Sequence, residues 1–390
     1  MKRIGIEASH AVAEAVKLAN VDVVAAYPIT PQTHIVERLA EMIANGEINA
    51  QYIPVESEHS AMSACMGSVA VGARTFTSSA SQGLELMQEV MFVTSAMRLP
   101  VIMLVANRAL SGPLNIWGDH SDAMAARDCG WIQLFAANAQ EAFDLTLCAF
   151  KIGEDNRVLL PVMVNIDGFH VSHVIESLEM TGQAEVDKFL PKFTYPYPLD
   201  PAKPVTMGAY ALPNTYTEVK MTQLEAMKNS RQVILQVLNE FDKISGRKHL
   251  PIEKYNADNS DVLFVCIGSY SETVSYAIDE LKEQGINVGL IRILLWRPFP
   301  LEEFKAAVAK AKTLIVLDRS VIPGGPTGPV CSEIKTALYG EKNAPNIVSF
   351  VGGLGGRDIS AKTFANVIKQ GIQMAGKPAS GELNMIEVRE

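Results

Sequence analysis

The chain has 390 residues, of which 48% are hydrophobic and 20% are charged, a balance typical of a globular protein with about two or three domains. Its net charge of −9 comes without a basic stripe interleaved with aromatic residues, which argues against nucleic acid and anionic membranes as partners. The five cysteines lie far apart and form no C-x-x-C pair, so we expect neither an iron–sulfur cluster nor a structural zinc site held by this chain alone, and we assign no metal ligands in it.

The amino-terminal segment starts with basic residues, but Glu7, His10 and Glu14 interrupt any apolar core of the kind that a secretory signal needs. No apolar run in the sequence reaches the roughly 18 residues that span a bilayer. We therefore expect a cytoplasmic protein that does not associate with membranes.

In the first half of the chain, short runs rich in β-branched and apolar residues alternate with helical patterns. The helical patterns, such as the one over 33–46, place apolar residues three and four positions apart and end in glycine. Strands are predicted over 21–28, 50–56, 74–79, 100–107 and 160–167. This alternation is typical of a parallel sheet covered by helices on both faces, and it predicts the α/β class.

A second alternating series begins near residue 258 and predicts a separate, smaller α/β domain. Its strands are predicted over 261–269, 287–293, 313–320 and 346–353. A proline-rich linker and a long amphipathic helix around 216–246 separate the two series. The predicted divisions are a first domain over 1–195, a linker with the long helix over 196–257, a second domain over 258–375, and a tail over 376–390 that is loosely held or docked on a partner.

Polar side chains follow each of the five strands predicted in the first domain. In open parallel sheets, ligands bind outside the carboxyl ends of the strands. The polar segments are Pro28-Ile29-Thr30, Glu56-Ser57-Glu58-His59, Ser78 to Gln82, Asn107-Arg108 and Asp167-Gly168. Five such ends in one domain indicate a ligand site rather than five unrelated turns.

Two of the candidate residues also have a plain structural interpretation. Thr30, which lies between Pro28 and Pro31, can cap the helix that follows the turn. Glu58, in a first helical turn, can simply complement the helix dipole. The helix behind Glu58 is rich in Ala, Gly and Ser, however, and such small residues permit the close approach of another chain or of a flat ligand.

Arg108 ends an apolar strand and opens a long loop. A guanidinium at this point can fork onto a bound carboxylate. The alternative is an ion pair with Asp119 or Asp122 in the loop itself. The residue types alone favour neither interpretation.

Three further features carry weaker signals. His170 and His173 offer two imidazoles, but no third ligand is near them in the sequence, so we expect no metal there. The glycine-rich segments 322–329 and 352–358 fit neither G-x-G-x-x-G nor the P-loop. We interpret both segments as loops that allow close backbone packing against another domain or subunit.

Eight motifs along the chain resemble, in the same order, those of one protein family, the α subunits of the four-subunit pyruvate:ferredoxin oxidoreductases. The motifs are YPITP, ESEHSA, RTFTSSASQGLELM, NRALSGPLNIWGDHSD, RDCGWIQ, EDNRVLLPVMV, RPFP and GLGGRD. The resemblance extends from about residue 5 to about residue 370 and is specific because the motifs occur together and in order.

The resemblance implies a thiamin-diphosphate enzyme. This subunit would supply an α/β domain that faces the aminopyrimidine ring of the cofactor, followed by a transketolase-C-terminal-like α/β domain. A β subunit would bind the diphosphate and Mg²⁺ and carry a [4Fe-4S] cluster, while a ferredoxin-like δ subunit would carry more clusters and a γ subunit would complete the assembly. Pyruvate and coenzyme A would be the substrates, and ferredoxin would receive the electrons.

Residue by residue, the resemblance implies that Thr30 contacts the substrate, that Arg108 holds the pyruvate carboxylate, and that Glu58 binds N1′ of the aminopyrimidine. Pro28 and Ile29, in the same turn as Thr30, are assigned to the cofactor site. The prolines would fix this turn so that the Thr30 hydroxyl points into the cofactor cleft. An oxalate-using relative has arginine at the position of Thr30, which argues against oxalate as the substrate.

The implied reaction is the oxidative decarboxylation of pyruvate to acetyl-CoA and CO₂, run in either direction. Two alternatives stay open: the same chemistry on another 2-oxoacid, such as 2-oxoglutarate or a branched-chain one, and a non-catalytic assembly subunit. The joint presence of Thr30, Glu58 and Arg108 argues against the second alternative.

Overall fold

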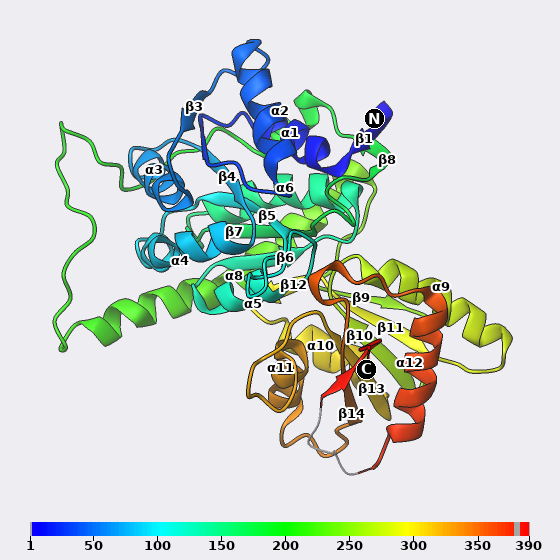
Figure 1. Cartoon of the computed structure of the whole chain (residues 1–390). Helices are drawn as coiled ribbons and strands as arrows, with labels where there is room; N and C mark the ends of the chain where they lie inside the picture. Colours follow the sequence, from blue (N-terminus) through cyan, green and yellow to red (C-terminus); the bar gives the residue numbers. More distant parts are fainter. Residues whose placement is uncertain (1, 378–382, 390) are drawn as a thin grey trace.

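The computed structural model describes residues 2–377 and 383–389. These residues form two lobes, the first coloured blue to green in Figure 1 and the second yellow to red. A seven-stranded sheet lies in the first lobe and a six-stranded sheet in the second, and a two-stranded antiparallel ribbon is attached to the first.

The first lobe alternates strands and helices along the chain. Its elements are β1 (Lys2–Glu7), α1 (Ala8–Leu18), β2 (Val23–Ala26), α2 (Thr33–Ala44), β3 (Gln51–Pro54), α3 (Glu58–Ala70), β4 (Thr75–Ser79), α4 (Ser81–Ala96), β5 (Ile102–Asn107), α5 (Ser121–Ala125), a 3₁₀ turn (Ala126–Asp128), β6 (Ile132–Phe135), α6 (Ala139–Glu154), β7 (Val162–Asp167), β8 (Ile175–Met180), α7 (Gln183–Phe189) and α8 (Tyr216–Ser245).

The second lobe follows the same alternation. Its elements are β9 (Ile252–Tyr255), β10 (Val262–Cys266), α9 (Tyr270–Glu283), β11 (Gly289–Ile293), β12 (Leu295–Arg297), α10 (Leu301–Val308), β13 (Thr313–Asp318), α11 (Pro329–Leu338), β14 (Asn346–Val351), a 3₁₀ turn (Leu354–Gly356), α12 (Ala361–Met374) and β15 (Asn384–Met385).

The seven-stranded sheet has the order β12-β6-β7-β5-β4-β2-β3, and all its pairs are parallel except β12 with β6. Because side chains alternate across a strand, Ile102 and Leu104 of β5 pack with α1 and α6 in one cluster, whereas Met103 and Val105 pack with α3 and α4 in another. The predicted parallel sheet covered on both faces is therefore confirmed, and each of the five predicted segments contains a strand.

Two strands of this sheet carry no clear sequence signal. Residues 132–135 form a buried strand of four residues, and residues 295–297 form one of three, too short for a period of two to stand out. β12 also comes from the second predicted domain yet pairs with β6 of the first. This strand therefore crosses from the second predicted domain into the sheet of the first. The predicted boundaries of the domains stay a prediction.

The six-stranded sheet has the order β15-β14-β13-β10-β11-β9, with only β9 antiparallel to its neighbour. All four strands predicted in this part of the chain are present. Asn384 and Met385 of the predicted tail pair with β14 of the same chain, so these two residues are not loosely held. That the tail docks on a partner stays a prediction. Residues 378–382 and Glu390 of the predicted tail lie outside the described residues.

The predicted linker and long helix are both present. Residues 196–215 extend away from the first lobe in Figure 1, and α8 then returns to pack against α4, α6 and α7. In the described ranges, no helix has both the length and the apolar composition that crossing a membrane requires.

Candidate functional site at the carboxyl edge of the first sheet

The polar segments predicted at the strand ends lie along one edge of the seven-stranded sheet. Neighbouring strands in the order β7-β5-β4-β2-β3 are parallel, so their carboxyl ends point the same way. The residues that end or follow these strands include Asp167, Arg108, Ser79, Thr30 and Glu58. The sheet thus gathers residues from distant parts of the sequence at one place.

Thr30 lies in a turn that a buried glutamine holds in shape. The backbone N–H of Gln32 donates to the carbonyl of Ile29 (2.9 Å), and the hydroxyl of Ser78 donates to the Gln32 side chain (2.9 Å). Pro28 and Thr30 are exposed in this turn. The alternative interpretation of Thr30 as a helix cap is wrong, because the residue before α2 is Gln32.

Arg108 joins this turn to the loop after β5. Its Nη1 donates to the carbonyl of Thr30 (3.0 Å), and its Nε donates to the carbonyl of Asn115 (2.8 Å). The alternative ion pair is not formed: the Asp119 carboxylate accepts from other groups, and Asp122 accepts from the backbone N–H of Arg108 rather than from its guanidinium. The structure therefore brings Thr30 and Arg108 into direct contact.

The guanidinium of Arg108 is buried without an anionic partner. The residue is only 7% exposed, and burial lowers its pKa although the nearby Asp122 opposes this shift. Within the described ranges, neither an ion pair nor an acceptor for Nη2 is present at this side chain. An unpaired buried cation is costly, and a carboxylate ligand on the free side of the fork would remove that cost.

Glu58 starts α3 and is buried as well. Ser57 caps the helix by accepting from the backbone N–H of Ser60 (3.2 Å), which fixes the position of Glu58 in the first turn. The residue is 6% exposed, and burial raises the pKa of its carboxyl group. Among residues 2–377 and 383–389, no side chain forms a hydrogen bond or ion pair with this carboxyl, so it is available to a ligand.

Gly83 of α4 is the close neighbour of Glu58. A Cβ atom at this position would lie 2.5 Å from Oε1 of Glu58 and 2.6 Å from Oγ of Ser79, so a larger residue would force these two side chains to move. The Ser79 hydroxyl is buried and has no hydrogen-bond partner in the described part of the chain. The carboxyl and the hydroxyl thus form a small polar site beside Gly83.

Sequence reasoning missed a buried ion-pair network at the same edge. Asp167, at the end of β7, accepts hydrogen bonds from Nε2 of His120 (2.9 Å), from the backbone N–H of Ser269 (2.8 Å), and from Arg319. Burial alone would raise the pKa of Asp167, but the charges of Arg319 and His120 outweigh it and hold this pKa well below its usual range. Because Ser269 and Arg319 belong to the second lobe, the network joins the two lobes.

A signal for this network was present in the sequence. Arg319 directly follows β13, just as Arg108 directly follows β5. Applying the rule of polar strand ends to the second domain would have singled it out. The pairing with Asp167 itself has no local signal, because the two residues are 152 positions apart.

The glycine-rich segment 352–358 packs against the loop that carries Arg108. The backbone N–H of Gly355 donates to Asp119 (3.0 Å), and Asn115 donates to the carbonyl of Gly355 (3.1 Å). A Cβ at Gly356 would overlap the side chain of Trp117. This segment is interpreted as a loop that packs closely against another domain or subunit, and it does pack against a loop of the other lobe.

Two family models match the chain. The model described as pyruvate flavodoxin/ferredoxin oxidoreductase, thiamine diphosphate-binding, matches residues 14–239, and the model described as pyruvate:ferredoxin oxidoreductase core domain II matches residues 260–364. The two matched ranges cover most of the first and second lobes.

Curated relatives match over nearly their whole length. The chain is 46% identical to the pyruvate synthase subunit PorA of Pyrococcus furiosus, with 95% of this chain and 93% of the relative covered. It is 42% identical to the ketoisovalerate oxidoreductase subunit VorA of Pyrococcus abyssi, with 94% of each chain covered.

A solved structure shares the fold at low identity. The 2-oxoglutarate:ferredoxin oxidoreductase of Magnetococcus marinus, with 2-oxoglutarate, coenzyme A and succinyl-CoA bound, superposes with a TM-score of 0.73 at 18% identity. The match covers 95% of this chain and 65% of that chain, so this chain spans slightly less than two thirds of the length of that structure.

Proposed function

The chain belongs to the pyruvate flavodoxin/ferredoxin oxidoreductase family, and on that premise we propose that it is the subunit that binds the substrate carboxylate in a pyruvate synthase. The complex converts pyruvate and coenzyme A to acetyl-CoA and CO₂ and passes two electrons, one at a time, to ferredoxin. In the reverse direction the same complex makes pyruvate.

One observation carries this proposal: the buried, unpaired guanidinium of Arg108 next to Thr30. Arg108 has donors to spare on one side of its fork, and a planar carboxylate suits that geometry. The exposed hydroxyl of Thr30 lies in the turn whose carbonyl Arg108 already contacts, so it can donate to the same ligand. Holding a 2-oxoacid at its carboxylate orients the adjacent carbonyl carbon for reaction, which contributes several kcal/mol to catalysis.

The residues around Glu58 fit the aminopyrimidine end of thiamin diphosphate. A carboxyl with a raised pKa, a close glycine and a buried hydroxyl without a partner offer polar atoms that a flat heteroaromatic ring can engage. When bound, thiamin diphosphate accepts the electron pair that remains as the substrate carboxylate leaves as CO₂. In this proposal Glu58 holds a proton at N1′ of the ring and thereby favours its reactive tautomer.

The other cofactors are assigned to partner subunits. All five cysteines of the chain are free and buried, which does not suit a cluster held by thiolates. We assign the diphosphate, Mg²⁺ and [4Fe-4S] clusters to β and δ subunits, with a γ subunit completing the complex. Ferredoxin would then dock on the cluster-bearing subunits rather than on this one.

A second candidate function is the same reaction on a branched-chain 2-oxoacid. The observation behind this candidate is the 42% identity to a ketoisovalerate oxidoreductase subunit. The identity to the pyruvate synthase subunit is higher, at 46%. The deciding experiment is to purify the assembled complex and to measure kcat/KM for pyruvate, 2-oxoisovalerate and 2-oxoglutarate with coenzyme A and ferredoxin. We expect pyruvate to be preferred at least tenfold, and a preference for either other acid would overturn the assignment.

A further inference from the structure

Three possible metal ligands meet where β1, α1 and α2 come together. Glu7 ends β1, His10 lies in the first turn of α1, and His34 lies in the first turn of α2. One oxygen or nitrogen atom from each residue lies within 4.8 Å of the others, and all three side chains are partly buried. Oε1 of Glu7 is already 2.7 Å from Nδ1 of His34.

The backbone places these side chains on ordered elements. Glu7 is the residue directly before α1, and His10 lies in the first turn of that helix. His34 follows the Thr30 turn, which the buried Gln32 ties to β4. On its other side the ring of His34 lies against that of His173, with centroids 4.4 Å apart. The cluster is therefore built before any ion arrives, which lowers the cost of binding one.

A second group of similar composition provides a contrast. Glu141, His249 and Glu253 also offer three ligand atoms within reach of one another. There, however, Arg292 forms ion pairs with both carboxylates, and His249 is bonded to Asp144. The ligand atoms of that group are therefore already engaged by other side chains of the protein. In the described residues, Glu7 has no arginine or lysine partner and is joined only to His34.

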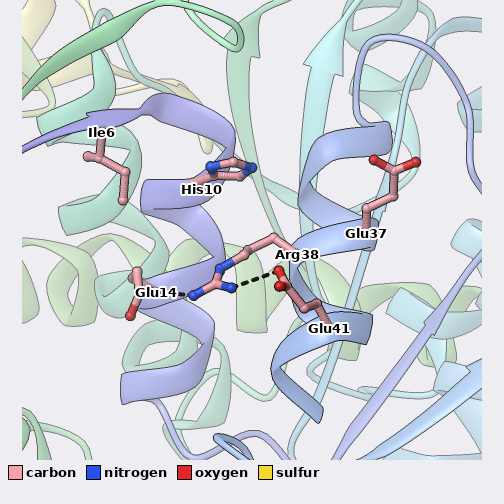
Figure 2. Close-up of a pocket in the computed structure, with 6 residues that line it drawn as sticks. All are labelled: Ile6, His10, Glu14, Glu37, Arg38 and Glu41. Carbon is pink, nitrogen blue, oxygen red and sulfur yellow. Dashed lines mark hydrogen bonds and ion pairs between the residues drawn. The ribbon is translucent and has the colours of Figure 1, made fainter. Parts of the chain in front are cut away.

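One of the three proposed ligands, His10, also lines a pocket of ≈ 550 Å³ between α1 and α2, together with five other residues. Figure 2 shows His10 extending from α1 toward α2, with Glu14, Glu37 and Glu41 around the opening. Arg38 is the one cation in this lining, and it is paired with Glu14 and Glu41. The remaining excess of carboxylates favours the entry of a cation.

We propose that Glu7, His10 and His34 bind a divalent transition-metal ion of the Zn²⁺ type, with water in the remaining positions. Two imidazoles and a carboxylate suit Zn²⁺ or Co²⁺ rather than Mg²⁺ or Ca²⁺, which prefer oxygen ligands. The ion inserts between Oε1 of Glu7 and Nδ1 of His34 and replaces the proton of that hydrogen bond, which leaves to solvent. It thereby ties the start of α2, four residues after Thr30, to the amino-terminal strand and helix.

The test uses the full chain without a histidine tag, stripped of metal with a chelator and titrated with CoCl₂. We expect one Co²⁺ per chain, a visible d–d absorption band and a matching release of protons. ZnCl₂ should displace the Co²⁺ and raise the melting temperature. The variants His10→Phe, which keeps the ring, and Glu7→Gln should each weaken binding at least tenfold.

The matched control is His59→Ala, because His59 faces Glu89 at 3.9 Å in an exposed pair, and no group of three possible ligands in the described ranges includes it. This variant should bind Co²⁺ as the unmodified chain does. Circular dichroism of each variant shows whether it is folded, and His34→Ala gives an independent loss of one ligand. The proposal is overturned if the unmodified chain binds no stoichiometric Co²⁺, or if folded variants of Glu7, His10 and His34 bind it unchanged.

Discussion

Arg108 is buried and positively charged, and its Nη2 has no acceptor in the described residues. The informative substitution is therefore lysine, which keeps the charge but lacks the forked guanidinium. We expect Arg108→Lys to raise KM for pyruvate at least tenfold, about 1.4 kcal/mol, because an ammonium cannot replace a forked contact. Thr30→Ala removes one hydrogen bond, about 0.5–1.5 kcal/mol, and should have a milder effect. Steady-state kinetics of the assembled complex measure both changes.

The control for this pair is Arg127→Lys. Among the residues that the structure describes, Arg127 bonds only within its own turn, to the carbonyl of Met124 (2.7 Å), and to Asp128. Its KM and kcat should stay as in the unmodified complex. Unchanged kinetics in both Arg108→Lys and Thr30→Ala would mean that neither side chain touches the substrate.

Glu58 is expected to act on the cofactor and not on the substrate. Glu58→Gln is nearly isosteric, so the complex should assemble and bind thiamin diphosphate, but an amide cannot hold the proton that a carboxyl with a raised pKa holds. Hydrogen–deuterium exchange at C2 of the bound cofactor, measured without substrate, should slow. The loss of turnover should be equal for all 2-oxoacids.

A neighbouring carboxylate provides the matched control for Glu58. Glu56 is exposed and accepts from the hydroxyl of Ser60, so Glu56→Gln should leave C2 exchange unchanged. If C2 exchange in Glu58→Gln is as fast as in the unmodified complex, Glu58 does not act on the cofactor and only complements the helix dipole.

At the scale of elements, the close approach of α3 and α4 at Gly83 decides where Glu58 lies. Gly83→Ala should destabilise the chain by about 1–3 kcal/mol, because the new Cβ overlaps Oε1 of Glu58 and Oγ of Ser79. We expect the affinity for thiamin diphosphate to fall together with the stability. Gly67→Ala on α3 meets nothing within 4 Å and should stabilise the chain by up to about 1 kcal/mol. Melting temperatures and titrations with thiamin diphosphate compare the Gly83→Ala and Gly67→Ala variants. If both substitutions change these quantities equally, the steric explanation is contradicted.

The sequence predicted the elements that have a long, regular pattern. Buried strands such as β5 and amphipathic helices such as α2 carry enough residues for their period to be recognised. β12, with three residues, and the antiparallel ribbon of β1 and β8 depend on partners far along the chain. Their positions are set by tertiary pairing, which a local pattern does not contain.

The candidate site was predicted in part for the same reason. Thr30, Glu58 and Arg108 follow strands, and the topology of a parallel sheet brings strand ends to one edge. The contact between the Arg108 guanidinium and the Thr30 carbonyl, and the cradle at Gly83, depend on side-chain packing and required coordinates.

At the scale of the whole molecule, Asp167 holds the two lobes together at the edge that carries the site. Asp167→Asn should cost about 3–5 kcal/mol of stability, because it leaves Arg319 buried without its anion. Adding Arg319→Met should recover part of this loss. Asp261→Asn, which breaks the exposed pair with Lys312, should cost less than about 1 kcal/mol. Denaturant unfolding of the unmodified chain and of these three variants measures the differences, and a double variant no more stable than Asp167→Asn would argue against a coupled pair.

The pairing of β12 with β6 also sets an order of events during synthesis on the ribosome. β6 ends at Phe135 and its partner begins at Leu295, so about 160 residues must be added before the pair can form, roughly 8–30 s at common elongation rates. Until then the first sheet has an open edge of unpaired N–H and C=O groups at β6, the kind of edge on which strands of other chains can add. The nascent chain is therefore most exposed to association with its neighbours while residues 136–294 are being made, and an early stop in that interval would release a first lobe with this edge uncovered.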